Sequence, residues 1–205
     1  VEDNVVLPAG YTVSWSGQYE YMQRAKEKLS VVIPITLAII ILLLYLNFRS
    51  FIEVFIVMGT LPMALVGGVL LLYILDYDLS VAVGIGFIAL AGVSVEIGVV
   101  MLVYLNHALN DQKELARKNN KPLTVEAIKE AIISGALLRV RPIMMTVLTI
   151  VFGLLTVMIG DGTGSEVMRR IATPMVGGIV SATVLTLIVI PSIFLIIHTI
   201  RIKKV

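Results

Sequence analysis

The chain has 205 residues, of which 58% are hydrophobic and 15% are charged, and its mean hydropathy is +0.99. Because soluble domains carry about 25% charged residues, this composition is typical of a membrane protein. The net charge of +2 is small and no basic patch is interleaved with aromatic residues, which argues against a nucleic-acid partner. The chain has no cysteine, so disulfide frameworks and thiolate chemistry are excluded. It begins at Val1 without an initiator methionine, and we expect it to be a piece of a longer protein.

Residues 1–28 do not have the composition of a membrane span. Tyr11, Val13 and Trp15 alternate with small polar residues, and a period of two is typical of a half-buried strand. Residues 18–29 then place apolar side chains at helical spacing. We predict that residues 1–28 are the end of a soluble domain, followed by a helix that leads into the membrane.

The rest of the chain, residues 29–205, contains five apolar stretches that are each long enough to cross a bilayer, since about 20 apolar residues suffice. The predicted spans are residues 29–48, 54–75, 79–105, 142–160 and 171–199. The predicted fold is therefore all-α, a membrane domain of five transmembrane helices. Residues 124–136 set apolar against charged positions at helical spacing, which predicts an amphipathic helix on the cytoplasmic membrane surface.

The distribution of lysine and arginine predicts the orientation of the spans. Eleven of the sixteen basic residues fall at Arg49, in the connection 106–141 or in the tail that begins at Arg201. Basic residues are enriched in cytoplasmic loops. Five spans then leave the N-terminal segment outside and the C-terminus in the cytoplasm.

The third span carries one charged residue far from either end, Glu96. At about 1.5 Å per residue it lies roughly 25 Å along the helix, within a hydrocarbon core about 30 Å thick. Ile85, Ala89 and Gly92 share its helical face, so we expect the carboxyl group to face a neighbouring helix. Burial disfavours the charged form, which favours a proton carrier that loads on one side and unloads on the other. The alternative is a buried, protonated glutamate that only hydrogen-bonds to a neighbour.

Met168 is a candidate metal ligand. It follows the glycine-rich segment 160–164 at the start of the last span, and thioethers favour soft Cu(I). The alternative is ordinary packing, which is the usual role of methionine among aliphatic residues. No nucleophile–base spacing, metal-ligand spacing or Walker motif occurs, which counts against an enzyme.

Four segments resemble the heavy-metal branch of the resistance-nodulation-division (RND) efflux pumps. They are residues 15–20 (WSGQYE), 89–102 (ALAGVSVEIGVVML), 137–142 (LLRVRP) and 164–168 (GSEVM), in the family's order. The resemblance implies the end of a periplasmic α/β porter subdomain and the last five of twelve transmembrane helices. It also implies a homotrimer in the bacterial inner membrane, joined to a periplasmic adaptor and an outer-membrane channel, that exports metal ions against proton entry.

The resemblance also implies roles for single residues. Glu96 falls on the glutamate of the family's proton relay, and Met168 on a methionine that copper and silver members use in a stepwise metal path. The family commonly has a relay lysine directly after an Arg-Pro pair, and this sequence has Ile143 there. Either Arg139 or Arg141 substitutes, or the relay relies on groups outside this chain, or the sequence is not under selection for pumping.

The implied function is proton-driven export of heavy-metal cations by a secondary transporter, not an enzyme, with no resident cofactor. Residues 15–20 and Met168 favour Cu(I) or Ag(I) over Zn(II), Co(II) and Cd(II) as the transported ion. A drug-exporting pump of the same superfamily and a structural membrane module that transports nothing are the alternatives.

Overall fold

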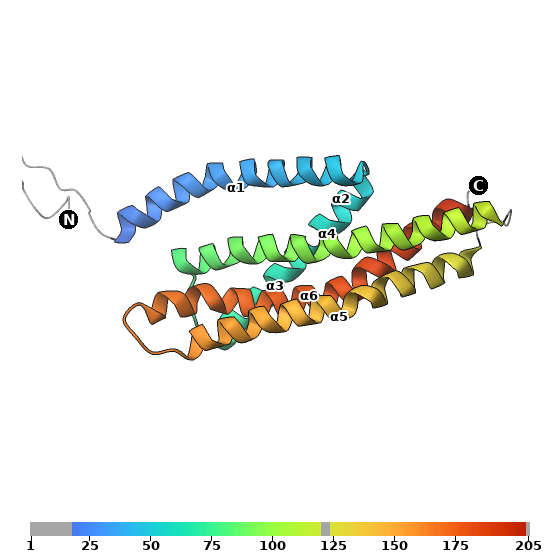
Figure 1. Ribbon diagram of the computed structural model, residues 1–205. Helices are drawn as coiled ribbons and strands as arrows, with labels where there is room; N and C mark the ends of the chain where they lie inside the picture. The colour runs from blue at the N-terminus through green and yellow to red at the C-terminus, as the bar shows by residue number, and fades with distance from the viewer. Residues whose placement is uncertain (1–17, 120–123, 204–205) are drawn as a thin grey trace, which may run out of the picture. The chain divides into compact units, whose positions relative to one another are not determined.

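The computed structural model describes residues 18–119 and 124–203, so the strand expected near residues 11–15 lies outside them. The described residues form the helices α1 (Gln18–Phe48), α2 (Phe51–Met58), α3 (Thr60–Ile74), α4 (Val81–Lys118), α5 (Val125–Ile159) and α6 (Ser165–Lys203) (Figure 1). The chain divides into one unit that ends at Leu44 and a second that begins at Tyr45. The first contains most of α1, a 31-residue helix with Pro34 inside it. The second contains α2–α6, which pack together.

Five segments among the described residues are long and apolar enough to cross a membrane. They are Gln23–Phe48, Phe51–Ile74, Val81–Lys118, Val125–Ile159 and Ser165–Ile200. The prediction of an all-α protein with five long apolar helices is therefore confirmed for the described residues. The division into two domains at residue 28 stays a prediction.

The second span is built from two helices that meet at Gly59. Helix α2 ends at Met58, and the Gly59 amide donates to the Phe55 carbonyl oxygen at 2.9 Å. Pro62 lies in the first turn of α3, where its missing N–H would have had no helical partner. The proline therefore accounts for a new helix beginning here.

Helices α4 and α5 are longer than their predicted spans, and this corrects one expectation. The segment 124–136 is helical as predicted, but it is not a separate helix, because α5 runs without interruption from Val125 through Pro142 to Ile159. Ile128 and Ile132 are buried, and a Cβ atom on Gly135 would lie 2.8 Å from the Cβ of Ala108 on α4. The apolar stripe thus packs against the end of α4, and the two helices run side by side (Figure 1).

Helix α6 is the centre of the second unit and packs against α3, α4 and α5. Glycines let α3 and α6 approach closely: a Cβ atom on Gly177 would lie 2.5 Å from the Gly67 carbonyl oxygen. Contacts of this kind are typical of membrane helices, whose interfaces are enriched in small residues.

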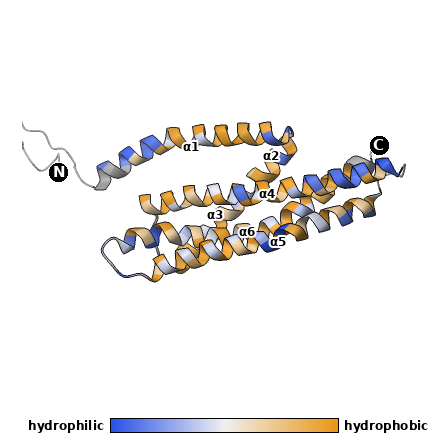
Figure 2. Ribbon diagram, in the orientation of Figure 1, coloured by the Kyte–Doolittle hydropathy of each residue, from blue (hydrophilic) through white to orange (hydrophobic). Residues whose placement is uncertain are grey.

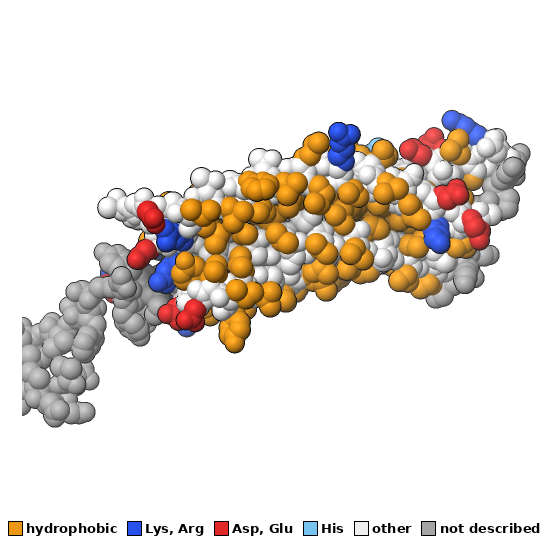
Figure 3. Space-filling view, turned by 90° about the horizontal axis from the view of Figure 1, so that it is seen from below, with side chains coloured by type: hydrophobic (Ala, Val, Ile, Leu, Met, Phe, Trp, Pro, Cys, Tyr) orange, Lys and Arg blue, Asp and Glu red, His pale blue; other side chains and the backbone are white. Residues whose placement is uncertain are grey.

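The helices of the second unit are apolar in the middle and more polar toward their ends, which is the distribution expected of helices that cross a membrane. Hydrophobic residues dominate the middle of α4 and α6, and hydrophilic residues gather toward the far end of α4 (Figure 2). On one face, most charged side chains lie toward the two ends and hydrophobic side chains fill the surface between them (Figure 3).

Candidate functional site

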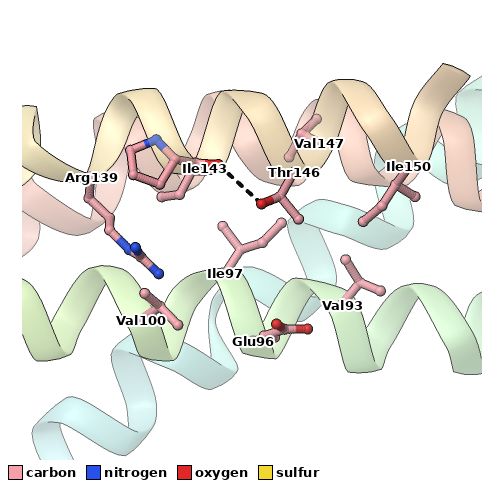
Figure 4. Close-up of a pocket in the computed structure, with 10 residues that line it drawn as sticks. Val93, Glu96, Ile97, Val100, Arg139, Ile143, Thr146, Val147 and Ile150 are labelled. Atoms are coloured by element: carbon pink, nitrogen blue, oxygen red, sulfur yellow. Dashed lines mark hydrogen bonds between the residues drawn. The ribbon is translucent and has the colours of Figure 1, made fainter.

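A small hollow between α4 and α5 contains Glu96. Its volume is about 60 Å³, and its lining residues from α4 are Val93, Glu96, Ile97 and Val100. The lining residues from α5 are Arg139, Pro142, Ile143, Thr146, Val147 and Ile150. Figure 4 shows Arg139 extending from α5 toward Val100 on α4, with Glu96 about one helical turn before Val100 in the chain. The structure therefore brings together two of the predicted site residues, Glu96 and Arg139.

Helical periodicity explains why these side chains meet. On α5, residues 139, 143, 146 and 150 are separated by steps of four, three and four, which places them on one face. Arg141 is two residues from Arg139, so it points to another side of the helix. It is exposed and does not line the hollow. Of the two arginines offered as substitutes for the family lysine, geometry thus favours Arg139.

Arg139 is partly buried at the wall of the hollow. Its guanidinium carbon lies 4.7 Å from the centre of the Tyr104 ring on α4, a distance at which a cation is attracted to the ring face. Its Nε is buried and has no hydrogen-bond partner among the described residues. No ion pair joins Arg139 to Glu96 in the part of the chain that the structure describes.

Ile143, where the family resemblance implies a lysine, is 5% exposed and lines the same hollow. The hydroxyl group of Thr146 lies one turn away and donates to the Pro142 carbonyl oxygen at 3.1 Å (Figure 4). Sequence reasoning missed Thr146 and Tyr104. Thr146 could have been found from its spacing of seven residues from Arg139, but nothing in the sequence pairs Tyr104 with Arg139.

The face of α4 that carries Glu96 is open within the described residues. Glu96 is exposed, Ile85 is 48% exposed, and a Cβ atom on Gly92 would meet nothing within 4 Å. Within the second unit, α5 therefore adjoins Glu96 at the hollow, while the positions of Ile85 and Gly92 on the same face of α4 are left uncovered. The buried face of α4 is a different one, which includes Leu90 and Ser94, and Leu90 packs near Gly68 of α3 and Gly178 of α6.

The hollow has room for water beside a titratable side chain. A cavity needs roughly 10–15 Å³ on this measure to hold one water molecule, so several fit into about 60 Å³. A carboxyl group beside such a hollow can exchange protons with water.

Met168 lies in the first turns of α6, away from this hollow. Its side chain is 56% exposed, and its amide donates to the Gly164 carbonyl oxygen at 3.4 Å. The preceding loop is tied to α6 by Arg169, which donates to the Gly160 carbonyl oxygen at 2.8 Å and pairs with Asp161. The described residues contain no group of three or more His, Cys, Asp or Glu side chains arranged to hold a metal ion.

The sequence pattern of the AcrB/AcrD/AcrF family matches residues 1–198. The chain belongs to this family. It is 48% identical over 204 residues to the putative cation efflux system protein SilA of Salmonella typhimurium and 46% identical over 206 residues to the cation efflux system protein CusA of Escherichia coli K12. Each match covers 100% of this chain. The cobalt-zinc-cadmium resistance protein CzcA of Cupriavidus metallidurans is 36% identical over 97% of the chain.

Solved structures agree with this assignment. The crystal structure of a heavy metal efflux pump superimposes on 97% of the chain with a TM-score of 0.75 and 32% sequence identity. The resemblance to heavy-metal RND pumps is therefore confirmed. This member of the AcrB/AcrD/AcrF family spans about a fifth of its relatives, namely 19% of the SilA protein, 20% of the CusA protein and 18% of the crystallised pump.

Proposed function

We propose that this chain is the C-terminal membrane portion of an RND pump that exports heavy-metal cations in exchange for protons. The observation that carries the proposal is the meeting of Glu96 and Arg139 at a water-sized hollow between two membrane-spanning helices. An ionisable residue at this depth is costly and marks a functional site by default. The relatives, which are named as cation efflux and metal resistance proteins, supply the substrate class.

In this proposal Glu96 takes up a proton from the outer side and releases it to the cytoplasm. Arg139 supplies a fixed positive charge at the wall of the same hollow. One proton that crosses about 100 mV contributes roughly 2.3 kcal/mol, and one pH unit adds about 1.4 kcal/mol. Together these sustain a cation gradient of a few hundred-fold per proton, which suits an exporter.

The proposed setting is the bacterial inner membrane, with the C-terminus in the cytoplasm. The remaining seven of twelve helices and the rest of a periplasmic porter domain would come from the missing part of the subunit. The open face of α4 around Gly92 then accepts one of those helices. The whole pump would be a homotrimer joined to a periplasmic adaptor and an outer-membrane channel.

The proposed transported ion is Cu(I) or Ag(I), with Met168 as one of its ligands along the path. A thioether is a soft ligand that favours these ions over Zn(II), Co(II) or Cd(II). Met168 is 56% exposed in the first turn of α6, so a passing ion can reach it. Further ligands would come from the porter domain, because the described residues offer no His, Cys, Asp or Glu cluster.

The test is the substitution Glu96→Gln in the full-length pump, with Glu114→Gln on the same helix as the matched control. Glu114 is exposed in the polar extension of α4 and does not line the hollow. Metal tolerance of cells and metal-driven proton flux in proteoliposomes are measured together. We expect Glu96→Gln to abolish both and Glu114→Gln to leave both near the wild-type level. Normal export by Glu96→Gln would refute the carrier role.

A further inference from the structure

A second, larger hollow lies where α2 begins and α6 ends. Its volume is about 440 Å³, and polar side chains line most of it. The titratable groups in its wall are Glu53 from α2, His107 and Lys113 from α4, and His198 from α6. A cavity needs roughly 10–15 Å³ on this measure to hold one water molecule, so this polar hollow holds a body of water. The proposed orientation places it on the cytoplasmic side of the membrane.

Glu96 and His107 lie on the same face of α4. Eleven residues separate them, which is close to three turns of about 3.6 residues, so their side chains leave the helix in directions about 20° apart. Along the helix axis the separation is roughly 17 Å at about 1.5 Å per residue. One face of one helix therefore leads from the Glu96 hollow, within the membrane, to the polar hollow at its edge.

A single apolar turn separates the two hollows along this face. Val100 lines the Glu96 hollow one turn after Glu96 (Figure 4), and Val103 lines the polar hollow. Three residues, or about 4.5 Å along the axis, lie between the two valines. Both valines belong to the face that Glu96 and His107 share, since steps of four, three and four residues connect the four positions.

His107 is the titratable group of the polar hollow that lies on this face. Glu53 comes from α2 and accepts a hydrogen bond from the Asn106 amide at 2.9 Å, and His198 comes from α6. Lys113 is six residues beyond His107, which places it on another side of α4. An imidazole can take up a proton on one ring nitrogen and release one from the other near neutral pH. This chemistry suits a relay between an apolar turn and cytoplasmic water.

We propose that the proton released by Glu96 leaves for the cytoplasm along this face of α4, across the turn of Val100 and Val103 and through His107. The proposal rests on the proposed carrier role of Glu96 and adds its exit route. The carboxylic acid of Glu96 gives its proton to water in its own hollow and becomes a carboxylate. Water carries the proton across the valine turn to one ring nitrogen of His107, and the other ring nitrogen releases a proton to the polar hollow. His107 ends neutral, and one proton has reached the cytoplasm.

His107 is tested in the full-length pump in proteoliposomes, by metal-driven proton flux measured against the pH on the cytoplasmic side. His107→Gln keeps a polar side chain that cannot carry a proton, and we expect it to lower the flux at least about tenfold. His107→Glu restores a titratable group and should recover much of the flux. The acceptor must be unprotonated, and a carboxyl group ordinarily has a pKa about two units below that of an imidazole, so the flux of His107→Glu should persist to lower pH than that of the wild type.

The other titratable groups that face His107 are the same in both variants, so they affect the two pH profiles alike. They are Glu53, Lys113 and His198. A wild-type flux in His107→Gln, or equal losses in His107→Gln and His107→Glu, would overturn the assignment of His107.

The valine turn is tested with one added ring. Val103→Phe extends the apolar turn into the polar hollow, where there is room for it, and is expected to lower the metal-driven proton flux severalfold. Val99→Phe is the matched control, because Val99 is also half-buried on α4 but lines neither hollow among the described residues. Both fluxes are normalised to the amount of folded pump. Equal fluxes from the two variants would remove the valine turn from the route.

The exit route and the carrier role fail in different ways. Normal transport by Glu96→Gln would refute the carrier and, with it, this route. If Glu96→Gln is inactive while His107→Gln and Val103→Phe both transport as the wild type does, Glu96 remains the carrier and only the exit route is wrong.

Discussion

The close approach of α3 and α6 at Gly177 predicts a large effect of one added methyl group. In Gly177→Ala the new Cβ atom would lie 2.5 Å from the Gly67 carbonyl oxygen and 2.6 Å from the Cβ of Leu71. Ordinary van der Waals contact begins near 3.4 Å, so α3 and α6 must separate by about 1 Å. The opposing atoms belong to the backbone and to a Cβ, so no flexible side-chain end can move aside. Overpacking of this kind costs about 1–3 kcal/mol.

The assay is the thermal stability of the full-length pump in detergent, read as the fraction that remains monodisperse after heating. Gly177→Ala should lower the midpoint by several degrees. The matched control is Gly153→Ala on α5, where an added Cβ atom meets nothing within 4 Å. There the change should be neutral or slightly stabilising, since alanine favours a helix over glycine by about 0.5–1 kcal/mol. If Gly177→Ala proved as stable as Gly153→Ala, the close approach of α3 and α6 would be wrong.

Two further predictions concern the proposed transport path. Arg139→Gln should strongly reduce metal tolerance and proton flux, whereas Arg141→Gln should change neither. Adding Ile143→Lys to Arg139→Gln should restore part of the activity, because it returns a cation to the hollow. Equal losses from the two arginine variants would contradict the geometry. Met168→Leu should lower the metal tolerance of cells that express the full-length pump, whereas Met145→Leu on α5 should leave it unchanged, and equal tolerance of the two variants would remove Met168 from the metal path.

The helical type and the number of spans among the described residues could be predicted from the sequence, because the hydrocarbon core sets a minimum length for an apolar run. The ends of the helices could not be predicted, and the division of the second span into α2 and α3 was not predicted. The apolar stripe that includes Ile128 and Ile132 has the same spacing whether it rests on a membrane surface or on another helix. The structure shows that it packs against α4, where Leu105 and Leu109 are also buried. Periodicity gives the buried face of a helix but not the identity of what covers it.

The candidate site was predictable to a similar extent. Glu96 stands out because it is the one charge deep in an apolar span. The choice between Arg139 and Arg141 was left open, although a spacing of four residues from Ile143 already places Arg139 on the face that a lysine at that position would share. The sequence alone could not predict that this face of α5 packs against α4, because that contact depends on tertiary packing. The contact between Gly67 and Gly177 could not be predicted for the same reason, because the spans contain many glycines and the sequence does not show which of them lie at a helix contact.

If Arg139 takes the part of the lysine that the family resemblance implies at Ile143, the proposed relay works differently. A lysine can release its proton when it is buried, whereas an arginine in a protein remains protonated. In the proposed relay Arg139 can therefore attract the ionised carboxylate of Glu96, but it cannot itself receive or deliver the transported proton. That task falls to water in the hollow, whose volume of about 60 Å³ holds several molecules. A bulkier residue in place of Thr146 would exclude this water and slow proton exchange while leaving both charges in place, which separates the role of the solvent from that of the arginine.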